Sequence, residues 1–423
     1  MRPLEWAEIV AVGSELLTPS RIDTNSLTIT SRLNAAGIRV RAKAVVGDRA
    51  ADLAQVFAGA LRRADLVVLT GGLGPTDDDV TREVVAQVLG RTLHEDASIV
   101  EGLRARFARR GLPMPDANRR QALVPEGATV LPNANGTAPG LWIEHGDQLV
   151  VLLPGPPREL VPMFDTHVQP RLEAMSGGVR LYSRIVRVFG RGESHVEEAI
   201  RPHLSSWASA SPPIEVTILA ARGAVDLYLN VAAASEADAA AVLDRAADEA
   251  VASLGDDVYS RSEQGIEEIV GTLLRDRGWR IAAAESCTGG LLMGRLTDVP
   301  GSSAYVHSGV VCYSNEAKSA LVGVDPALID AHGAVSEPVA TAMADGIRQR
   351  TGAEVGIGIT GIAGPGGGSP QKPVGTVCYS VRTPDGAVTR TRWSTGGREL
   401  VRAIAVHTAL DMVRRMMTGR PVP

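Results

Sequence analysis

The sequence predicts an α/β protein in which two larger three-layer α/β domains are joined by a smaller α+β unit. Three observations predict this organisation. The 423 residues are too many for one ordinary hydrophobic core and correspond to about three domains. Short apolar runs alternate with helical periodicity in both the first and the last part of the chain. The pattern breaks around residues 166–178, where Met175–Gly178 is typical of a linker, so we expect domains at 1–170, 179–255 and 262–418.

The composition excludes several classes of protein. Hydrophobic residues make up 44% and charged residues 22%, which is typical of soluble globular domains. The net charge is −5 and basic residues are interleaved with acidic ones, so we expect no nucleic-acid partner. No apolar run approaches the roughly 20 residues of a membrane span, and Glu5 and Glu8 precede any signal-like stretch, so we expect no membrane association and a cytoplasmic location. The three cysteines are widely spaced without a CxxC pair, which argues against a disulfide framework or a zinc knuckle.

The first domain has the pattern of a βαβαβ chain. Strands are expected at Ile9–Val12, Val40–Val46 and Leu66–Thr70, and helices at Asn25–Ala36 and Leu53–Arg63. Such alternation predicts a mostly parallel sheet with helices on both faces. Ligands of these folds bind beyond the carboxyl ends of the strands, so the loops that follow strands are the places to search for a site.

The middle unit is smaller and mixed. Strands are expected at Arg184–Phe189, Ile214–Ala220 and Val225–Val231, and helices at Ser194–Leu204 and Glu236–Leu254. No group of side chains in it is typical of a catalytic site, so we interpret it as a structural or spacer unit.

The third segment begins near Gly265 and again alternates strands with helices. Its last helix is expected at Arg398–Met417, with Leu400, Val401 and Ile404 toward a core and Asp411 and Arg415 as an exposed pair; the residues after Thr418 are expected to fray.

The strongest candidate site of the third segment surrounds Ser286. A strand at Trp279–Ala283, a loop at 284–290 and a helix at Leu291–Leu296 would place Ser286 at a helix N-terminus. Unpaired N–H groups there would stabilise an alkoxide or a tetrahedral oxyanion, as acyl transfer requires. The alternative is that Ser286 is only a helix N-cap.

Two further strand ends supply polar groups. A strand at Val310–Tyr313 delivers Lys318, which could take a proton from Ser286 only if burial lowers its pKa from about 10.4 to near 7. The alternative is a solvated surface lysine. A strand at Glu354–Thr360 leads into the glycine loop 361–368, whose backbone N–H groups can approach a phosphate or ribose. Together these features predict an acyl-transfer site with a serine nucleophile.

The motifs AESCTGG, YSNEAK, HGAVSEPV, GITGIAGPGGG and KPVGTV resemble the CinA C-terminal family, the nicotinamide mononucleotide deamidases, over residues 262–415. The resemblance implies hydrolysis of nicotinamide mononucleotide to nicotinic acid mononucleotide and ammonia, without a cofactor. It implies these roles: Ser286 as nucleophile, Lys318 as base, Tyr313 and Thr360 in positioning or polarisation, Gly289, Gly290, Gly361 and Gly364 in substrate binding, and Arg398 at the substrate phosphate. Cys287 is the competing nucleophile, although no histidine stands in a matching motif to activate it.

The first domain has its own candidate site after the strand at Leu66–Thr70. The loop contains Gly71, Gly72, Gly74, Thr76, Asp78 and Asp79, with a helix expected to begin near Asp78. The glycines let the backbone approach a phosphate, and the two aspartates with Glu15 could hold a divalent cation. Helix-start aspartates are also common caps. The turns 135–140, with Asn135 and Gly136, and 153–159 are typical of loops that grip a nucleotide.

TGGLGPT, NGTAPG and LPGPPRE resemble the CinA N-terminal domain, which is related to the molybdopterin-binding fold, over residues 7–170; the middle unit of that family is KH-like. The resemblance implies a metal-dependent ADP-ribose pyrophosphatase that releases AMP and ribose 5-phosphate. A divalent metal ion is expected, with K+ as a second candidate ion, and a homodimer that acts on small-molecule nucleotides. The rival hypothesis is a nucleotide or molybdopterin binder without turnover, or a competence-linked scaffold.

Two departures from the family pattern affect these expectations. Thr18–Pro19 replaces the second glycine of GxELLxG, and proline removes a backbone N–H, which could weaken the pyrophosphatase. The middle unit lacks a GxxG loop, since Gly190–Glu193 does not fit that pattern, so RNA binding is not supported.

Overall fold

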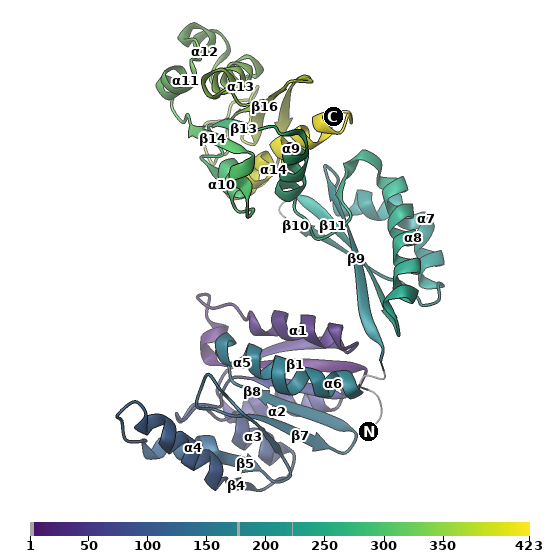
Figure 1. Cartoon of the computed structure of the whole chain (residues 1–423), viewed down its shortest axis with the longest axis vertical. Helices are drawn as coiled ribbons and strands as arrows, with labels where there is room; N and C mark the ends of the chain where they lie inside the picture. The colour runs from purple at the N-terminus through teal and green to yellow at the C-terminus, as the bar shows by residue number, and fades with distance from the viewer. Residues whose placement is uncertain (1–3, 176–177, 222) are drawn as a thin grey trace. The chain divides into compact units, whose positions relative to one another are not determined.

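The computed structural model describes residues 4–175, 178–221 and 223–423, so the predicted linker Met175–Gly178 lies partly outside the described residues. The chain divides into two compact units, Met1–Tyr182 with Val231–Ala240 and Ser183–Asn230 with Ala241–Pro423. Figure 1 labels most of the helices and many of the strands of both units. No helix of the described residues is long and apolar enough to span a membrane.

Within the described part of the first unit, six strands form one sheet in the order β2-β1-β3-β8-β7-β6. The strands are β1 (Trp6–Val12), β2 (Arg39–Val46), β3 (Leu66–Thr70), β6 (Thr129–Leu131), β7 (Gly140–His145) and β8 (Gln148–Leu153), beside a separate pair, β4 (Leu93–Glu95) and β5 (Leu123–Pro125). β2, β1, β3 and β8 are parallel, and β7 and β6 are antiparallel. The prediction of a mostly parallel sheet is confirmed.

Helices cover both faces of this sheet because its central strands are apolar on both sides. In β1, Ile9 packs with Ile29 and Leu33 of α1, whereas Val10 packs with Leu53 and Phe57 of α2. The helices are α1 (Asn25–Ala35), α2 (Ala50–Leu61), α3 (Thr81–Val88), α4 (Ala97–Ala108), α5 (Pro157–Met163) and α6 (Gln169–Met175), with the short helices η1 (Ser14–Leu17), η2 (Asp116–Ala122) and η3 (Phe164–Val168). Such uninterrupted burial is typical of parallel strands covered on both sides.

The middle unit is a small α+β fold with a four-stranded sheet in its described residues, in the order β10-β11-β9-β12. Its elements are β9 (Arg180–Phe189), α7 (Glu193–Ala208), β10 (Glu215–Ala221), β11 (Ala224–Ala233), α8 (Glu236–Leu254), η4 (Gly255–Asp257) and β12 (Val258–Ser260). β12 pairs with β9, so this sheet extends beyond the expected boundary at 255. The three residues of β12 are too few to be recognised from periodicity.

The C-terminal part carries a five-stranded sheet, as far as the structure describes it, in the order β14-β13-β15-β16-β17. The strands are β13 (Ile281–Glu285), β14 (Val306–Val311), β15 (Val355–Gly361), β16 (Thr376–Thr383) and β17 (Gly386–Trp393). The helices are α9 (Ile266–Arg277), α10 (Leu291–Thr297), η5 (Ser302–Ala304), α11 (Asn315–Val322), α12 (Pro326–His332), α13 (Glu337–Thr351) and α14 (Arg398–Met417). β14, β13 and β15 are parallel, and β16 and β17 are antiparallel.

Again both faces of the sheet are covered. Ile281 and Ala283 share a core with α9, α10 and α14, whereas Ala282 and Ala284 share one with α11, α12 and α13. Two predicted strands are displaced along the sequence: β13 begins two residues later than expected and β14 begins four residues earlier.

The bounds predicted for α14 are confirmed, but its polar face is not as expected. Asp411 and Arg415 are only 5% and 3% exposed, so their interpretation as an exposed pair is wrong. Leu400 is 39% exposed and does not face a core, whereas Val401 is buried. The reason for the first error is that Arg414 lies beside this pair and both guanidinium groups bond to Asp411, which lets the polar cluster be buried.

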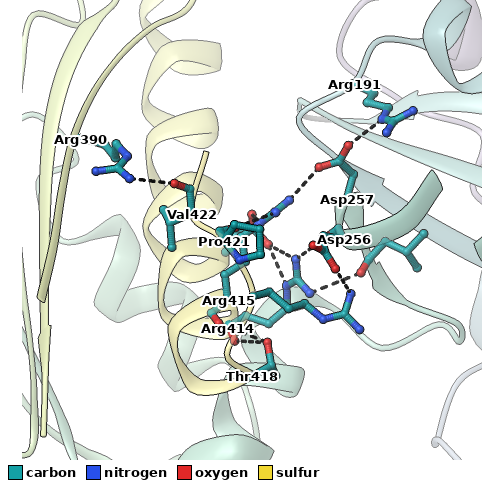
Figure 2. A network of polar contacts seen from close by, with 12 residues as sticks. Arg191, Asp256, Asp257, Arg390, Arg414, Arg415, Thr418, Pro421 and Val422 are labelled. Atoms are coloured by element: carbon teal, nitrogen blue, oxygen red, sulfur yellow. Dashed lines mark hydrogen bonds and ion pairs between the residues drawn. The ribbon is translucent and has the colours of Figure 1, made fainter. Parts of the chain in front are cut away.

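Figure 2 shows how this cluster connects α14 to the segment that follows α8. Arg415 contacts Asp257 at 2.8 Å, and Arg414 donates to the carbonyl oxygen of Asp256 at 2.9 Å. The end of the chain is held as well, since Arg415 donates to Pro421 O and Arg390 to Val422 O. The prediction of a frayed tail is therefore wrong.

Candidate functional sites

The C-terminal candidate site lies at the carboxyl ends of three adjacent parallel strands. Ser286 directly follows β13, and Lys318 lies on α11, the helix that follows β14. Thr360 is the second-last residue of β15. Ser314 caps α11 by accepting a hydrogen bond from the amide of Ala317, which fixes where the helix begins. The sheet topology therefore brings together groups that are far apart in the sequence.

Ser286 and Lys318 are in contact. Lys318 Nζ lies 3.2 Å from Ser286 Oγ, and these residues are 2% and 7% exposed, respectively. Nζ also lies 3.2 Å from Cys312 O and 3.4 Å from Tyr313 O. Burial lowers the pKa of Lys318. Among the described residues no carboxylate forms an ion pair with this lysine.

The three oxygen neighbours of Nζ can accommodate a neutral amine as well as an ammonium group, because the hydroxyl of Ser286 can either donate or accept. A neutral amine offers two N–H donors and one lone pair, whereas an ammonium group offers three donors and no acceptor. Two carbonyl oxygens can accept the two N–H groups, and the hydroxyl of Ser286 can then donate to the lone pair. This geometry can support proton abstraction from the serine.

The expected position of Ser286 at a helix N-terminus is wrong. α10 begins only at Leu291, with Gly290 as its N-cap, and a turn separates it from Ser286. The N–H groups of Gly290, Leu292 and Met293 donate to the carboxylate of Glu285 at 3.0–3.1 Å. Glu285 therefore occupies the donors that were expected to stabilise an oxyanion.

Cys287, the competing nucleophile, is poorly placed to act. It is 5% exposed, and burial raises the pKa of its thiol to about 12. The thiolate is the reactive form of cysteine, so a protonated and buried thiol is unreactive. This favours Ser286 as the nucleophile of this loop.

The other predicted residues of the site surround this pair. Tyr313 is 59% exposed, and its hydroxyl lies 2.9 Å from Arg398 Nη2, while Nη1 of Arg398 donates to Gly364 O at 2.9 Å. Arg398 therefore links the tyrosine loop to the glycine loop. Thr360 is buried, and its hydroxyl donates to Ala334 O at 2.8 Å. That contact positions the segment before α13.

The remaining glycines of this site lie in its loops. Gly361 closes β15, and Gly289 and Gly290 are in the turn after Ser286 with φ of +59° and +92°. Two residues that sequence reasoning missed also act on this turn: Glu285, which caps α10, and Arg402, which bonds to the turn from α14. In the sequence, Glu285 could have been noticed only as a carboxylate directly before Ser286, and Arg402 only as an arginine one helical turn after Arg398.

The first unit contains a cavity of about 660 Å³ at the carboxyl edge of its sheet. The volume is within the range typical of small-molecule sites, roughly 300–1,000 Å³. The predicted residues that line it are Glu15, Gly71, Gly72, Gly74, Asp78 and Asp79. Gly71 also has a packing role, because its φ is +94° and a side chain there would lie 2.2 Å from Val12 O.

The predicted metal ligands do not form a ready-made cation site. Among the described residues there is no group of three or more His, Cys, Asp or Glu side chains arranged to hold a metal ion. Asp79 Oδ2 is already bonded to the amide and hydroxyl of Thr76, at 2.9 and 2.5 Å. The α3 helix begins at Thr81 rather than near Asp78, because this local contact holds residues 76–79 in a turn. A hydrogen bond with Thr76 lowers the pKa of Asp78.

Not all predicted residues of this site lie in the larger cavity. Gly136 lines a second cavity of about 430 Å³, which shares Thr137 with the first. The side-chain amide of Asn135 donates to Arg158 O at 3.1 Å and so connects the two predicted binding loops. Within the described residues, the lining of the larger cavity includes Leu16 and Arg21 but not Pro19.

These features define a modular α/β protein in which two separate sheets each present polar side chains at their carboxyl edge, on either side of a small α+β unit. Residues 8–174 match the probable molybdopterin binding domain, residues 183–260 match the damage-inducible protein CinA KH domain, and residues 263–417 match the CinA C-terminal domain. The chain belongs to the CinA family. The resemblance read from the motifs, including the KH-like middle unit, is confirmed.

Two relatives align with nearly the whole of this chain, and a solved structure aligns with part of it. A competence-damage inducible protein of Symbiobacterium thermophilum is 47% identical over 98% of this chain and 99% of its own length. A CinA-like protein of Acidobacterium capsulatum is 46% identical over 97% of this chain and 99% of its own. The crystal structure of a competence/damage inducible protein from Agrobacterium tumefaciens is 41% identical and covers 36% of this chain and 96% of its own, with a TM-score of 0.35.

Proposed function

We propose that the C-terminal domain hydrolyses the amide of nicotinamide mononucleotide to give nicotinic acid mononucleotide and ammonia. The observation that carries this proposal is the contact of 3.2 Å between Lys318 Nζ and Ser286 Oγ in a buried setting without a carboxylate partner among the described residues. An amine in such a setting is disposed to be neutral, and a neutral amine can serve as general base. The substrate class comes from the family motifs.

The geometry supports a two-step mechanism. Lys318 takes the proton of Ser286 as Oγ attacks the carboxamide carbon, and a tetrahedral oxyanion forms. Lys318 then gives this proton to the amide nitrogen, the carbon–nitrogen bond breaks, and ammonia leaves an acyl-enzyme. In the second step Lys318 takes a proton from water, the hydroxyl attacks the ester, and the proton returns to Ser286. Tyr313 is exposed beside this pair and offers a surface for the pyridine ring, while Arg398 next to it supplies charge for the phosphate.

Ammonia release from nicotinamide mononucleotide tests this mechanism. Wild type should release ammonia, and Ser286→Ala should reduce the rate by roughly 10³-fold or more because the nucleophile is lost. Lys318→Met should reduce it by about 10²- to 10⁴-fold because the base is lost. The matched control is Cys287→Ala, which should retain activity. If folded wild type releases no ammonia, the deamidase proposal is rejected. If Cys287→Ala alone loses activity, the nucleophile is the thiol of Cys287 and not Ser286.

We propose a second activity for the first unit, the metal-dependent hydrolysis of ADP-ribose to AMP and ribose 5-phosphate. Its support is the 660 Å³ cavity with its charged lining of six carboxylates and one arginine (Glu15, Arg21, Asp23, Asp48, Asp78, Asp79 and Glu159). So acidic a lining repels a free diphosphate and favours a ligand that brings its own cation. A divalent ion, with K+ as the second candidate, is therefore part of the proposal.

AMP formation measured with and without added divalent ions and K+ tests this second activity. Release that requires a cation and falls in Asp78→Asn supports a pyrophosphatase. Saturable ADP-ribose binding without AMP under every ion condition would instead establish a nucleotide binder or scaffold. A homodimer and a cytoplasmic location belong to the same proposal, and light scattering of the purified protein measures the first of them.

A further inference from the structure

The guanidinium group of Arg402 contacts the backbone of the turn that carries Ser286. Arg402 lies on α14, one helical turn after Arg398, and its Nε donates to Cys287 O at 3.1 Å while its Nη2 donates to Thr288 O at 2.7 Å. One planar fork thus holds two successive carbonyl groups. Arg398 contacts other loops, so the two arginines have separate tasks although they share one face of the helix.

The contact reaches Ser286 through a single peptide group. In the peptide between Thr288 and Gly289, the carbonyl oxygen accepts from Arg402, and the N–H donates in turn to Ser286 O at 3.1 Å. A trans peptide directs these two groups to opposite sides, so Arg402 and Ser286 lie at the two ends of one chain of hydrogen bonds. Such chains polarise one another and fix the plane of the peptide between them.

The glycine after Thr288 gives an independent indication of this arrangement. Gly289 has φ of +59°, and a side chain there would lie 3.2 Å from Arg402 Nη2. A larger residue would be strained in the left-handed region and would also press on the guanidinium group. The turn is therefore shaped to admit Arg402 closely.

Arg402 also brings a positive charge to this turn. Among the described residues no carboxylate forms an ion pair with it, and its hydrogen-bond partners are the two carbonyl groups. A fixed positive charge behind the nucleophile turn stabilises negative charge that develops at the serine during attack.

We propose that Arg402 is a positioning residue for Ser286: it holds the carbonyl oxygens of Cys287 and Thr288, fixes the nucleophile turn, and supplies the charge that supports attack by the serine. The inference rests on the assignment of Ser286 as nucleophile in the proposed function, but it does not depend on the identity of the substrate. Lysine cannot reproduce it fully, because an ammonium group keeps the charge but lacks the planar fork.

The test measures labelling of the full-length protein by phenylmethylsulfonyl fluoride, followed by intact mass. In this reaction Ser286 Oγ forms a bond to sulfur, the sulfur–fluorine bond breaks, fluoride leaves, and the serine proton passes to Lys318. Arg402→Met should lower the maximal labelling rate by roughly 10- to 100-fold, with little change in the probe concentration that gives half the maximal rate. Arg402→Lys should fall between Arg402→Met and wild type. The matched control is Arg275→Met, because Arg275 is an exposed residue of α9 whose side chain donates to Thr272 of the same helix and lies over the ring of Tyr305, away from the turn of Ser286.

Amide exchange provides a second readout that needs no reaction. The Gly289 amide should exchange faster in Arg402→Met, because its peptide group loses the partner at its other end, while amides of β15 stay protected. Wild-type labelling rates in Arg402→Met, or no labelling of wild type at all, would overturn the inference. Equal losses in the Met and Lys variants accompanied by equal falls in melting temperature would overturn it too, because they would indicate a purely structural role. Ammonia release by wild type decides the deamidase separately.

Discussion

At the scale of single residues, the buried amine of Lys318 is the proposed base of the reaction, and the same burial should destabilise the fold. Lys318 is 2% exposed, its amine contacts a hydroxyl and two carbonyl groups, and no carboxylate among the described residues forms an ion pair with it. A buried amine in such surroundings disfavours protonation, so the folded state must either hold it neutral or bear an uncompensated charge. Both alternatives destabilise the fold relative to an apolar side chain of similar shape.

We therefore expect Lys318→Met to reduce ammonia release by about 10²- to 10⁴-fold but to raise the free energy of unfolding by about 1–2 kcal/mol at neutral pH. The pKa of Lys318 is lowered in the fold from its ordinary value of 10.5. Below 10.5 the unfolded chain binds a proton that the folded lysine disfavours, so the stability of wild type increases as pH rises toward that value. The advantage of the methionine variant should shrink over the same window.

Urea unfolding at several pH values between neutrality and about pH 10 measures this difference. Lys43→Met is the control, because Lys43 is an exposed residue of β2 and its replacement should leave stability nearly unchanged. If Lys318→Met were less stable than wild type at neutral pH, the amine would stabilise the folded state, and the expected trade-off between activity and stability would be contradicted.

At the scale of elements, α14 contacts the turn that carries Ser286 at one end and is buried in a polar cluster at the other. Arg398 and Arg402 lie in its first two turns, and Asp411, Arg414 and Arg415 lie near its last. The last three side chains are at most 5% exposed, and both arginines bond to Asp411 at 2.6–2.7 Å. The orientation of the arginines near the nucleophile therefore depends on a helix that is firmly held at its far end.

We expect Asp411→Asn to lower the free energy of unfolding by about 3 kcal/mol, because two buried guanidinium groups lose the carboxylate that they share. Asp248→Asn is the matched control, since Asp248 pairs with Arg261 in an ion pair whose side chains are 66% and 50% exposed. That change should lower stability by less than about 1 kcal/mol. Chemical unfolding of both variants measures the difference, and losses of equal size would contradict a special role for the buried cluster.

The elements also show how far sequence reasoning reached. Ser286 and Lys318 could be predicted because each follows a strand, and adjacent parallel strands end at the same edge. The start of α10 at Leu291 was predicted correctly, but the placement of Ser286 at its N-terminus was wrong, because the sequence does not reveal that Glu285 caps this helix. Asp411 and Arg415 have the spacing of an exposed helical pair, and only the packing of the segment after α8 buries them. The spacing of residues predicts which side chains share a face of a helix, but it does not predict whether other parts of the chain cover that face.

At the scale of the whole molecule, most of the middle fold belongs to one compact unit with the C-terminal domain; residues 231–240 are the exception. Asp257, which follows α8, contacts Arg191 of the middle fold at 2.6 Å and Arg415 of α14 at 2.8 Å (Figure 2). The ring of His407 on α14 also contacts two aromatic rings: its centroid lies 4.1 Å from that of Phe189 and 5.1 Å from that of Tyr259. The KH-like fold thus serves as a structural support for α14, a role that local sequence patterns could not reveal because its contacts are long-range.

Because each compact unit has its own core, we expect calorimetry to resolve two unfolding transitions, of which Asp257→Ala lowers only the one for the second unit. Burial acts to raise the pKa of Asp257, but hydrogen bonds from Arg191 and Arg415 hold it below its ordinary value of 3.8. The carboxylate therefore stabilises the fold above that pH, and the contribution is lost as pH falls through the lowered pKa. The midpoint should fall by roughly 2–4 °C for each 1 kcal/mol lost. Equal falls in the midpoints of both transitions would contradict the division into two units. A fall in the midpoint that persists in acid would contradict the stabilising role of the Asp257 carboxylate.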